Sequence, residues 1–373
     1  MNNNFAFAFQ EALKRYKSND WEGNWDFRRF GPFLPVSPSA TSNLGFRAEL
    51  KEKIKTLLAF LGLYQRKTLV SLIVKEQGLQ WLYERLSDAE SGKILIDVMA
   101  YRVLGHRKVK LPLNTPEYWD KLKALEGRAN TGDFIDLGFL GWRADRYDLK
   151  DEGYPIQVYA RAPGVFTQLL LQQYRCITPD HVIEVEAGDT VIDAGGCYGD
   201  TALYFAHKAG EKGRVFSFEF MPDNIRIFTR NLELNPGLAN QIEIISNPLW
   251  SSSGQRLYVE GIGPAAHITP SPKASDAKQV ETLKIDDLVE NRQLARVDFI
   301  KMDIEGAELE ALKGAAETIR RYRPKLAISV YHRLPDFWEI PQWIDGLGAG
   351  YRFHLRHFTI HTEETVLFAE SIR

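Results

Sequence analysis

The sequence predicts an α/β fold in which a parallel sheet carries helices on both faces, preceded by a mostly helical region. From Thr190 onward, apolar runs of strand type alternate with helical patterns, which is typical of parallel sheets. The run Thr190–Ile192 leads through Asp193 into a glycine-rich turn that opens directly into a helix. Before residue 130, by contrast, apolar residues recur mainly at helical spacing.

Helix signals dominate the first 130 residues. The apolar residues of 46–63 recur with the period of an amphipathic helix. The stretch Ser87–Glu90 is a capping box with Ser87 as N-cap, and the helix it opens should run to about Leu104. Thr115–Glu117 begins a further helix with proline at its first position.

The rest of the N-terminal half has weaker signals. Residues 1–40 are aromatic and end in a proline-spaced stretch, so we expect an irregular arm. Residues 131–160 are rich in glycine and aromatic residues and should join two parts of the chain. We therefore divide the sequence into a mostly helical region, 1–150, and a sheet domain, 151–373.

The alternation in the sheet domain sets its expected elements. Between them, the stretch 261–278 is rich in Gly, Pro, Ser and Ala and predicts a mobile loop, a candidate lid. The expected strands are 190–194, 214–219, 242–246, 297–302, 325–331, 351–357 and 364–369. The expected helices are 200–209, 222–234, 305–320 and 337–346.

Glycines and acids at strand ends predict a nucleoside site. Gly195 and Gly199 leave room for a ligand at the strand–helix turn, where backbone N–H groups converge. Glu219 ends the next strand, where an acid can accept hydrogen bonds from ribose hydroxyls. Asp193 precedes the turn and would repel a diphosphate, so a cationic cofactor fits better than NAD.

Several spaced motifs resemble one family over about residues 159–370. The stretch 193–199 is similar to the first motif of class I S-adenosylmethionine-dependent methyltransferases, with Cys197 where many members have Gly. The stretches 219–224, 282–288 and 297–308 are similar to the FkbM methyltransferase family, as are Asn231 and Asn235, which we interpret as structural.

This resemblance implies a Rossmann-like class I methyltransferase sheet whose last strand is antiparallel, and S-adenosylmethionine as cofactor. The residues that we expect to bind the cofactor are Asp193, Gly195, Gly199, Asp200, Thr201, Glu219, Phe220 and Asp303.

Acid–base candidates lie at the ends of later strands. Asp303 ends the fourth strand, at the edge where ligands of open α/β sheets bind. His332 follows the fifth strand and His357 ends the sixth, and a neutral imidazole can take a proton from a hydroxyl. We predict His332 as the base, His357 as second choice and Asp303 as the orienting acid. Asp303 with Glu305 could instead bind Mg²⁺, an alternative we do not favour.

These observations lead to an S-adenosylmethionine-dependent O-methyltransferase. The resemblance implies a hydroxyl of a sugar, a glycan or a polyketide-type natural product as acceptor. A nicotinamide-dependent oxidoreductase and a non-catalytic protein that keeps the cofactor fold are the alternatives.

Composition narrows the expected partners. The net charge of −2 favours no nucleic acid, and no apolar run is long enough to span a membrane. Cys176 and Cys197 lack the spacing of a metal site or disulfide framework, and the start carries no signal peptide, so we expect a cytoplasmic protein. The capped N-terminal helices need a partner surface, either the sheet domain or a second copy in a homo-oligomer.

Overall fold

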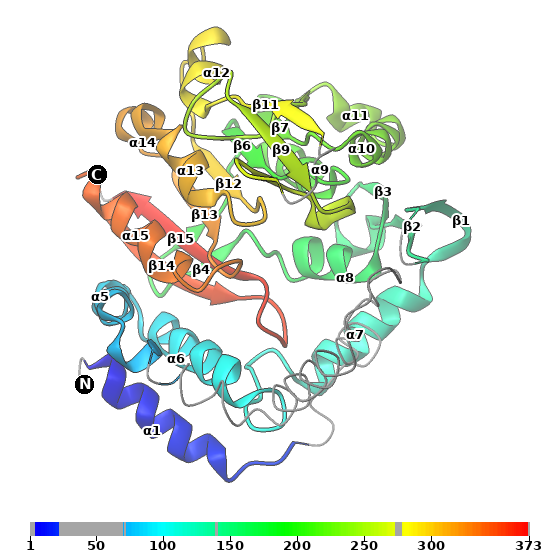
Figure 1. The fold of residues 1–373 in the computed structure, drawn as a ribbon. Helices are drawn as coiled ribbons and strands as arrows, with labels where there is room; N and C mark the ends of the chain where they lie inside the picture. Colours follow the sequence, from blue (N-terminus) through cyan, green and yellow to red (C-terminus); the bar gives the residue numbers. More distant parts are fainter. Residues whose placement is uncertain (1–3, 22–69, 71, 139–140, 273–277, 372–373) are drawn as a thin grey trace, which may run out of the picture.

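A seven-stranded sheet forms the centre of the fold (Figure 1). The computed structural model describes residues 4–371 except 22–69, 71, 139–140 and 273–277. The strand order is β14-β15-β13-β12-β6-β7-β8, and β15 runs antiparallel to its neighbours while β13, β12, β6, β7 and β8 pair in parallel. The strands are β6 (Thr190–Ala194), β7 (Arg214–Phe218), β8 (Ile242–Ile245), β12 (Phe299–Met302), β13 (Lys325–Ser329), β14 (Tyr351–His357) and β15 (Thr365–Ser371).

Successive residues of the central strands bury side chains on opposite faces. Ile192 and Ile300 belong to one core cluster, whereas their neighbours Val191 and Phe299 belong to the other. Both faces are apolar because helices cover both, as expected for parallel strands. The sheet is therefore doubly wound, and the expected fold class, with its antiparallel last strand, is confirmed.

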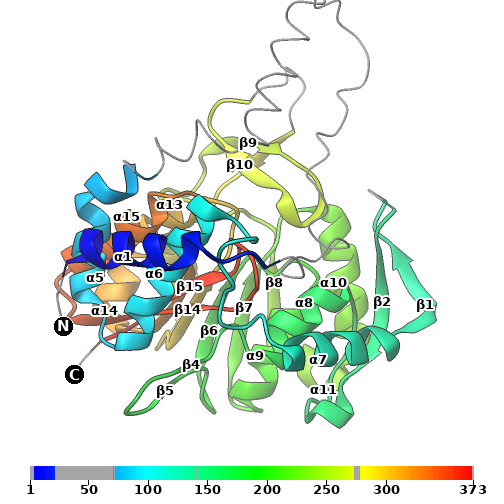
Figure 2. The same cartoon turned by 90° about the horizontal axis from the view of Figure 1, so that it is seen from below.

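Each face has its own set of helices. The first core cluster joins the sheet to α6 (Ala89–Leu104), α12 (Ile285–Asn291), α13 (Glu308–Lys313), α14 (Ala316–Tyr322) and α15 (Asp336–Gly346). The second joins it to α7 (Pro116–Gly127), α8 (Ala162–Val165), α9 (Asp200–Ala209) and α10 (Pro222–Leu234). Figure 2 shows the N-terminal helices beside α14 and α15, and α7 with α8 beside α9 and α10.

Part of the expected irregular arm is a helix, α1 (Phe5–Lys17). Phe5, Phe9 and Ala12 recur on one face and are buried, so burial of this stripe stabilises a helix that the aromatic composition obscured. The helix expected over 46–63 lies outside the described residues.

The N-terminal helices pack against the sheet domain. The helix α5 (Gln77–Arg85) contacts α15, and α6 contacts β14. The N-cap of α6 is Asp88 and not Ser87, because the Asp88 carboxylate accepts the Ser91 N–H at 2.7 Å. Ser87 instead donates its backbone N–H to the carbonyl of Phe353, which joins the helix to β14.

The segment expected as a connection contains an antiparallel sheet, β1 (Asn130–Asp136), β2 (Arg143–Asp148) and β3 (Gln157–Ala160). Asn231 and Asn235 on and after α10 hold β3 in place by hydrogen bonds to the backbone of Tyr159 and Gln157. These contacts fit the predicted structural role. Their partners lie 72 and 78 positions away in the sequence, so the hydrogen bonds are not local. A short pair, β4 (Cys176–Ile177) and β5 (Val182–Ile183), and the four-residue α11 (Pro236–Ala239) complete this half.

The expected mobile loop contains the strand β10 (His267–Thr269) of a small antiparallel sheet. The strands β9 (Arg256–Glu260), β10 (His267–Thr269) and β11 (Gln279–Glu281) pair in the order β10-β9-β11. The helix expected over 305–320 is divided into α13 and α14. Gly314 lies at the division and packs closely on Trp250, since a Cβ there would lie 2.2 Å from the Trp250 carbonyl oxygen. None of the helices among the described residues has the length and apolarity needed to cross a membrane.

Candidate active site

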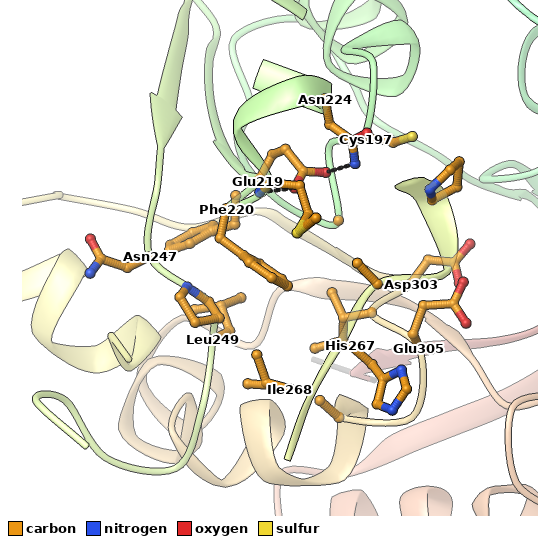
Figure 3. A pocket seen from close by; sticks show the side chains of 18 of the residues that line it. Cys197, Glu219, Phe220, Asn224, Asn247, Leu249, His267, Ile268, Asp303 and Glu305 are labelled. Carbon is orange, nitrogen blue, oxygen red and sulfur yellow. Dashed lines mark hydrogen bonds between the residues drawn. The ribbon is translucent and has the colours of Figure 1, made fainter. Parts of the chain in front are cut away.

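A cleft opens at the carboxyl ends of β6, β7 and β12 (Figure 3). In open α/β sheets this edge is where ligands bind. The turn after β6 and the ends of β7 and β12 form its walls, and residues of the small sheet, among them His267 and Ile268, close it from another side. The predicted lid segment thus contributes residues between Gly263 and Ile268 to the cleft.

The glycines of the turn are required by close packing. Gly195 lines the cleft with φ +89°, and a Cβ there would lie 2.0 Å from the carbonyl oxygen of Asp303. Gly199 has φ +82° and caps α9, where a Cβ would meet the Phe228 ring at 2.1 Å. Gly195 therefore lets the turn pack against the backbone that follows β12, while Gly199 lets α9 approach α10.

Asp193 lies beneath the turn and not on the cleft surface. Its side chain is fully buried, and Lys301 Nζ lies 3.0 Å from one oxygen. The other oxygen accepts hydrogen bonds from Ser217 at 2.7 Å and Thr201 at 3.1 Å. Lys301 also donates to the Gly195 carbonyl at 2.6 Å. The structure thus corrects the expected direct attraction between Asp193 and a cationic cofactor: Lys301 already balances the charge, and the pair positions the turn.

Asp200 and Thr201 also turn away from the cleft. Both are buried in the first turn of α9, and Thr201 is committed to Asp193. Burial raises the pKa of Asp200 to about 6, although hydrogen bonds and Lys301 oppose the shift. With its amide turned to donate, Gln168 bonds both oxygens of Asp200, at 2.6 and 3.1 Å. Asp200 and Thr201, predicted to bind the cofactor, thus stabilise the turn from below in this structure.

Glu219 and Phe220 line the cleft as predicted. The Glu219 carboxylate accepts the Met221 N–H at 2.7 Å and the Asn224 amide at 3.1 Å, which fixes its orientation. Burial raises its pKa, while these hydrogen bonds oppose the shift. Each carboxylate oxygen can accept further bonds, so Glu219 can still receive hydroxyls of a ligand. Phe220 and Leu249 supply apolar surface beside it (Figure 3).

Asp303 faces Glu219 across the cleft and is held by two tyrosines (Figure 3). Tyr331 donates its hydroxyl to one carboxylate oxygen at 3.0 Å, and Tyr174 donates to the other at 3.1 Å. His332 Nε2 lies 3.4 Å from the first oxygen. Asp303 is thus a firmly oriented acid at the predicted edge of the sheet.

His332 lies beside Asp303 as expected, but among carboxylates. Its Nδ1 lies 3.0 Å from Glu308, and its Nε2 lies 3.4 Å from Asp303 and 3.6 Å from Glu305. Burial lowers the pKa of the imidazole, but the three carboxylates outweigh burial and raise it to about 10. His332 is therefore an imidazolium near neutral pH, which argues against its predicted role as the base.

His357 is buried away from the described lining of the cleft. Its Nδ1 lies 2.8 Å from the Thr365 hydroxyl, and burial lowers its pKa to about 3. The ring is thus neutral but packed between β14 and β15. The structure does not bring this second predicted base to the cleft.

The acids around His332 bear on the Mg²⁺ alternative. Asp303, Glu308 and His332 each place a nitrogen or oxygen within 4.8 Å of the others, as metal ligands do. However, a protonated imidazole has no lone pair to offer, and it already supplies positive charge to the carboxylates. These groups pair as an imidazolium with carboxylates, and a divalent cation would bind only in exchange for the imidazole proton.

Comparison with known proteins identifies the region that holds this cleft. Residues 193–353 match the family described as the methyltransferase FkbM domain. The chain carries an FkbM methyltransferase domain. The FkbM domain spans the turn after β6, Glu219, Asp303 and His332, whereas His357 lies just beyond its matched range.

Similar proteins cover part of the chain. A stretch of 137 residues, 37% of the chain, is 31% identical to 54% of the hexuronic acid methyltransferase AglP of Haloferax volcanii. A stretch of 178 residues, 39% of the chain, is 26% identical to 68% of the methyltransferase sdnD of Sordaria araneosa. The crystal structure of the methyltransferase FkbM of Methylobacillus flagellatus has a TM-score of 0.51 at 21% identity, covering 81% of this chain and 60% of that one.

These similarities cover different shares of the similar proteins and support different conclusions. The chain spans about half the length of AglP and three fifths of the Methylobacillus protein. The structural similarity establishes the class I methyltransferase fold, and the domain match establishes the family of the region around the cleft.

The cleft of the FkbM domain has the features that S-adenosylmethionine needs. Gly195 brings the turn to the edge of the cleft, Glu219 offers acceptors for ribose hydroxyls, and Phe220 with Leu249 offers an apolar wall for a base. Acids on the Asp303 side suit the cationic part of the molecule. The residues present thus fit the cofactor of this family, which supplies an electrophilic methyl group when bound.

Sequence reasoning missed the buried groups that orient the FkbM site. Lys301 is a charged residue inside the apolar run Phe299–Met302, a signal that an internal partner must exist. Tyr174 and Tyr331 carry no such signal, because their contacts with Asp303 span 129 and 28 residues.

Proposed function

We propose that this protein transfers the methyl group of S-adenosylmethionine to a hydroxyl oxygen of a sugar. The observation that carries the proposal is the cleft of the FkbM domain, in which Glu219 lies on one side and the acids Asp303 and Glu305 on the other. One side can hold a nucleoside and the other can orient a hydroxyl. A non-catalytic binding protein would have no need of the second group.

In this proposal Glu219, Phe220 and the Gly195 turn hold the nucleoside part of the cofactor. Lys301 and Asp193 keep the turn in place from below. Alignment of acceptor oxygen, methyl carbon and sulfur is the main task of the protein, and such positioning can supply roughly 7–11 kcal/mol.

A sugar acceptor is favoured by the similarity to AglP, which is named for hexuronic acid. The charge of this cleft adds a distinction. Asp303, Glu305 and Glu308 surround one imidazolium, and Glu219 adds a further acid across the cleft, so an acidic sugar would meet repulsion that a neutral sugar would not. We therefore expect a neutral sugar to be the better acceptor. A polyketide-type hydroxyl is the second candidate.

The nicotinamide alternative also uses a strand-end acid for ribose, so Glu219 alone does not discriminate. The acidic Asp303 side does, because it suits a sulfonium better than a diphosphate. In thermal-shift titrations we expect S-adenosylhomocysteine to raise the melting temperature and NAD to leave it unchanged. The opposite pattern would contradict the proposal.

The transfer itself is tested with radiolabelled S-adenosylmethionine. Methyl β-D-glucopyranoside and methyl β-D-glucuronide form a matched pair that differs at one carboxylate. We expect label in the neutral sugar above the acidic one. Binding of S-adenosylhomocysteine without label in either sugar would contradict the sugar acceptor and leave the cofactor assignment standing.

A further inference from the structure

Glu305 is the acid of the cluster that opens to the cleft. Its side chain is 36% exposed, against 17% for Asp303, 9% for His332 and 0% for Glu308. Glu305 lines the cleft together with Asp303, and Figure 3 shows it on the same side as His267. An acceptor that enters the cleft can therefore reach the Glu305 carboxylate.

The backbone at Glu305 has an unfavourable conformation. Its φ is +57°, a left-handed conformation that is uncommon for glutamate, and Gly306 follows with φ +94°. Strained conformations of this kind cluster at functional sites. The turn between β12 and α13 thus presents Glu305 to the cleft.

The other groups of the cluster are committed to one another. Both oxygens of Asp303 accept tyrosine hydroxyls, and Glu308 accepts the Ile304 N–H at 2.8 Å besides facing His332. Among the described residues, the Glu305 carboxylate lies 3.6 Å from His332 Nε2, which is longer than a hydrogen bond. Glu305 is therefore free to accept a proton.

We propose that Glu305 is the general base of the transfer, a role that rests on the proposed function. The acceptor oxygen forms its bond to the methyl carbon as the carbon–sulfur bond breaks, and the electron pair of that bond goes to sulfur. The hydroxyl proton moves to a Glu305 carboxylate oxygen. His332 stays protonated and holds Asp303 and Glu308 in position.

The surroundings of Glu305 adjust its affinity for that proton. Burial raises its pKa to about 7; His332 opposes the shift, and Asp303, Glu308 and Glu363 add to it. These groups come from β12, α13, the segment after β13 and the β14–β15 connection, and Tyr331 and His267 face the same region. A base of this strength is matched to neutral pH.

The first test needs no cofactor. In ¹³C-carboxyl NMR of glutamate-labelled protein, the resonance that Glu305→Gln removes should titrate near pH 7. In the His332→Gln variant the same resonance should titrate higher, because the nearby positive charge is lost. A Glu305 carboxyl that titrates near its ordinary value would overturn the proposal, whatever the acceptor is.

The second test uses methyl β-D-glucopyranoside and labelled S-adenosylmethionine. Glu305→Gln should lower kcat by about 10²–10⁴-fold, with the affinity for S-adenosylhomocysteine unchanged. The wild-type rate should rise with pH through about 7 and then level, and Glu305→Asp should keep part of the rate. Glu317→Gln, at an exposed acid of α14, is the matched control and should behave as wild type.

The outcomes separate the two proposals. A wild type that transfers methyl while Glu305→Gln keeps its rate overturns the base and leaves the function intact. A rate that rises only near pH 10 assigns the proton to His332 and also overturns it. If the wild type binds S-adenosylhomocysteine but methylates neither sugar, the acceptor is wrong and the titration of Glu305 decides its role alone.

Discussion

At the scale of single residues, ion pairs between buried side chains fix the orientation of the groups in the site. His332 was predictable in position, since it follows an apolar strand, but its protonation depends on Glu308, which lies 24 positions earlier in the sequence. No local pattern reveals that contact. The same holds for Asp193. The motif identifies this acid, but its partner Lys301 lies in another strand and cannot be predicted from the motif.

The protonated His332 predicts a pH dependence of stability. Because its folded pKa is raised to about 10, its contribution is complete below about 6.5, the ordinary value, and is lost as pH rises through 10. The difference in unfolding free energy between wild type and His332→Gln should thus be large at pH 6 and small near pH 10. Urea unfolding at both pH values measures it, with the half-exposed His267→Gln as control. A difference independent of pH would contradict the imidazolium.

At the scale of elements, the strands were predicted closely because apolar runs of β-branched and aromatic residues mark them. The expected 190–194 and 351–357 coincide with β6 and β14. The sheet β1–β3 was missed, since its strand Asn130–Asp136 is polar and takes its place from contacts with distant segments. The split between α13 and α14 was also missed; Gly314 at the division packs on Trp250, which is distant in the sequence.

The junction of α6 with β14 should be sensitive to one residue. Asp88 caps α6 and also bonds His354 at 2.6 Å and Arg356 at 3.3 Å, with all three side chains largely buried. Burial alone would raise the pKa of Asp88, but the hydrogen bond from His354 and the other contacts lower it to about 2. Asp88→Ala should cost about 1–3 kcal/mol, because it removes the N-cap of α6 and leaves the buried His354 Nδ1 without this partner. Urea unfolding tests this against Asp151→Ala, which is exposed and should change little; equal stability of the two variants would contradict the account.

At the scale of the whole molecule, the N-terminal helices use the sheet domain as their partner surface. Ser87 bonds the backbone of Phe353, and the Trp338 ring fills the space beside Gly78 in α5. A division of the chain at residue 150 remains a proposal, as does a homo-oligomer through the helical region. The packing nevertheless indicates that the sheet domain depends on these helices.

Removal of residues 1–150 tests this dependence. The fragment 151–373 would expose Phe353 and leave Arg356 without Asp88. We expect it to aggregate or to bind S-adenosylhomocysteine more weakly than the full chain, as judged by size-exclusion chromatography and calorimetry. A soluble, monomeric fragment with full affinity would show that the helices are dispensable.

The central claim is that the cleft between Glu219 and Asp303 holds S-adenosylmethionine, and calorimetric titration with S-adenosylhomocysteine tests it most directly. The full chain should bind with one-to-one stoichiometry. Glu219→Ala should weaken binding about ten- to a hundredfold, because hydrogen bonds to a charged carboxylate contribute roughly 1.5–3 kcal/mol. Absence of binding to the wild type, or unchanged affinity in a folded Glu219→Ala variant, would contradict the claim.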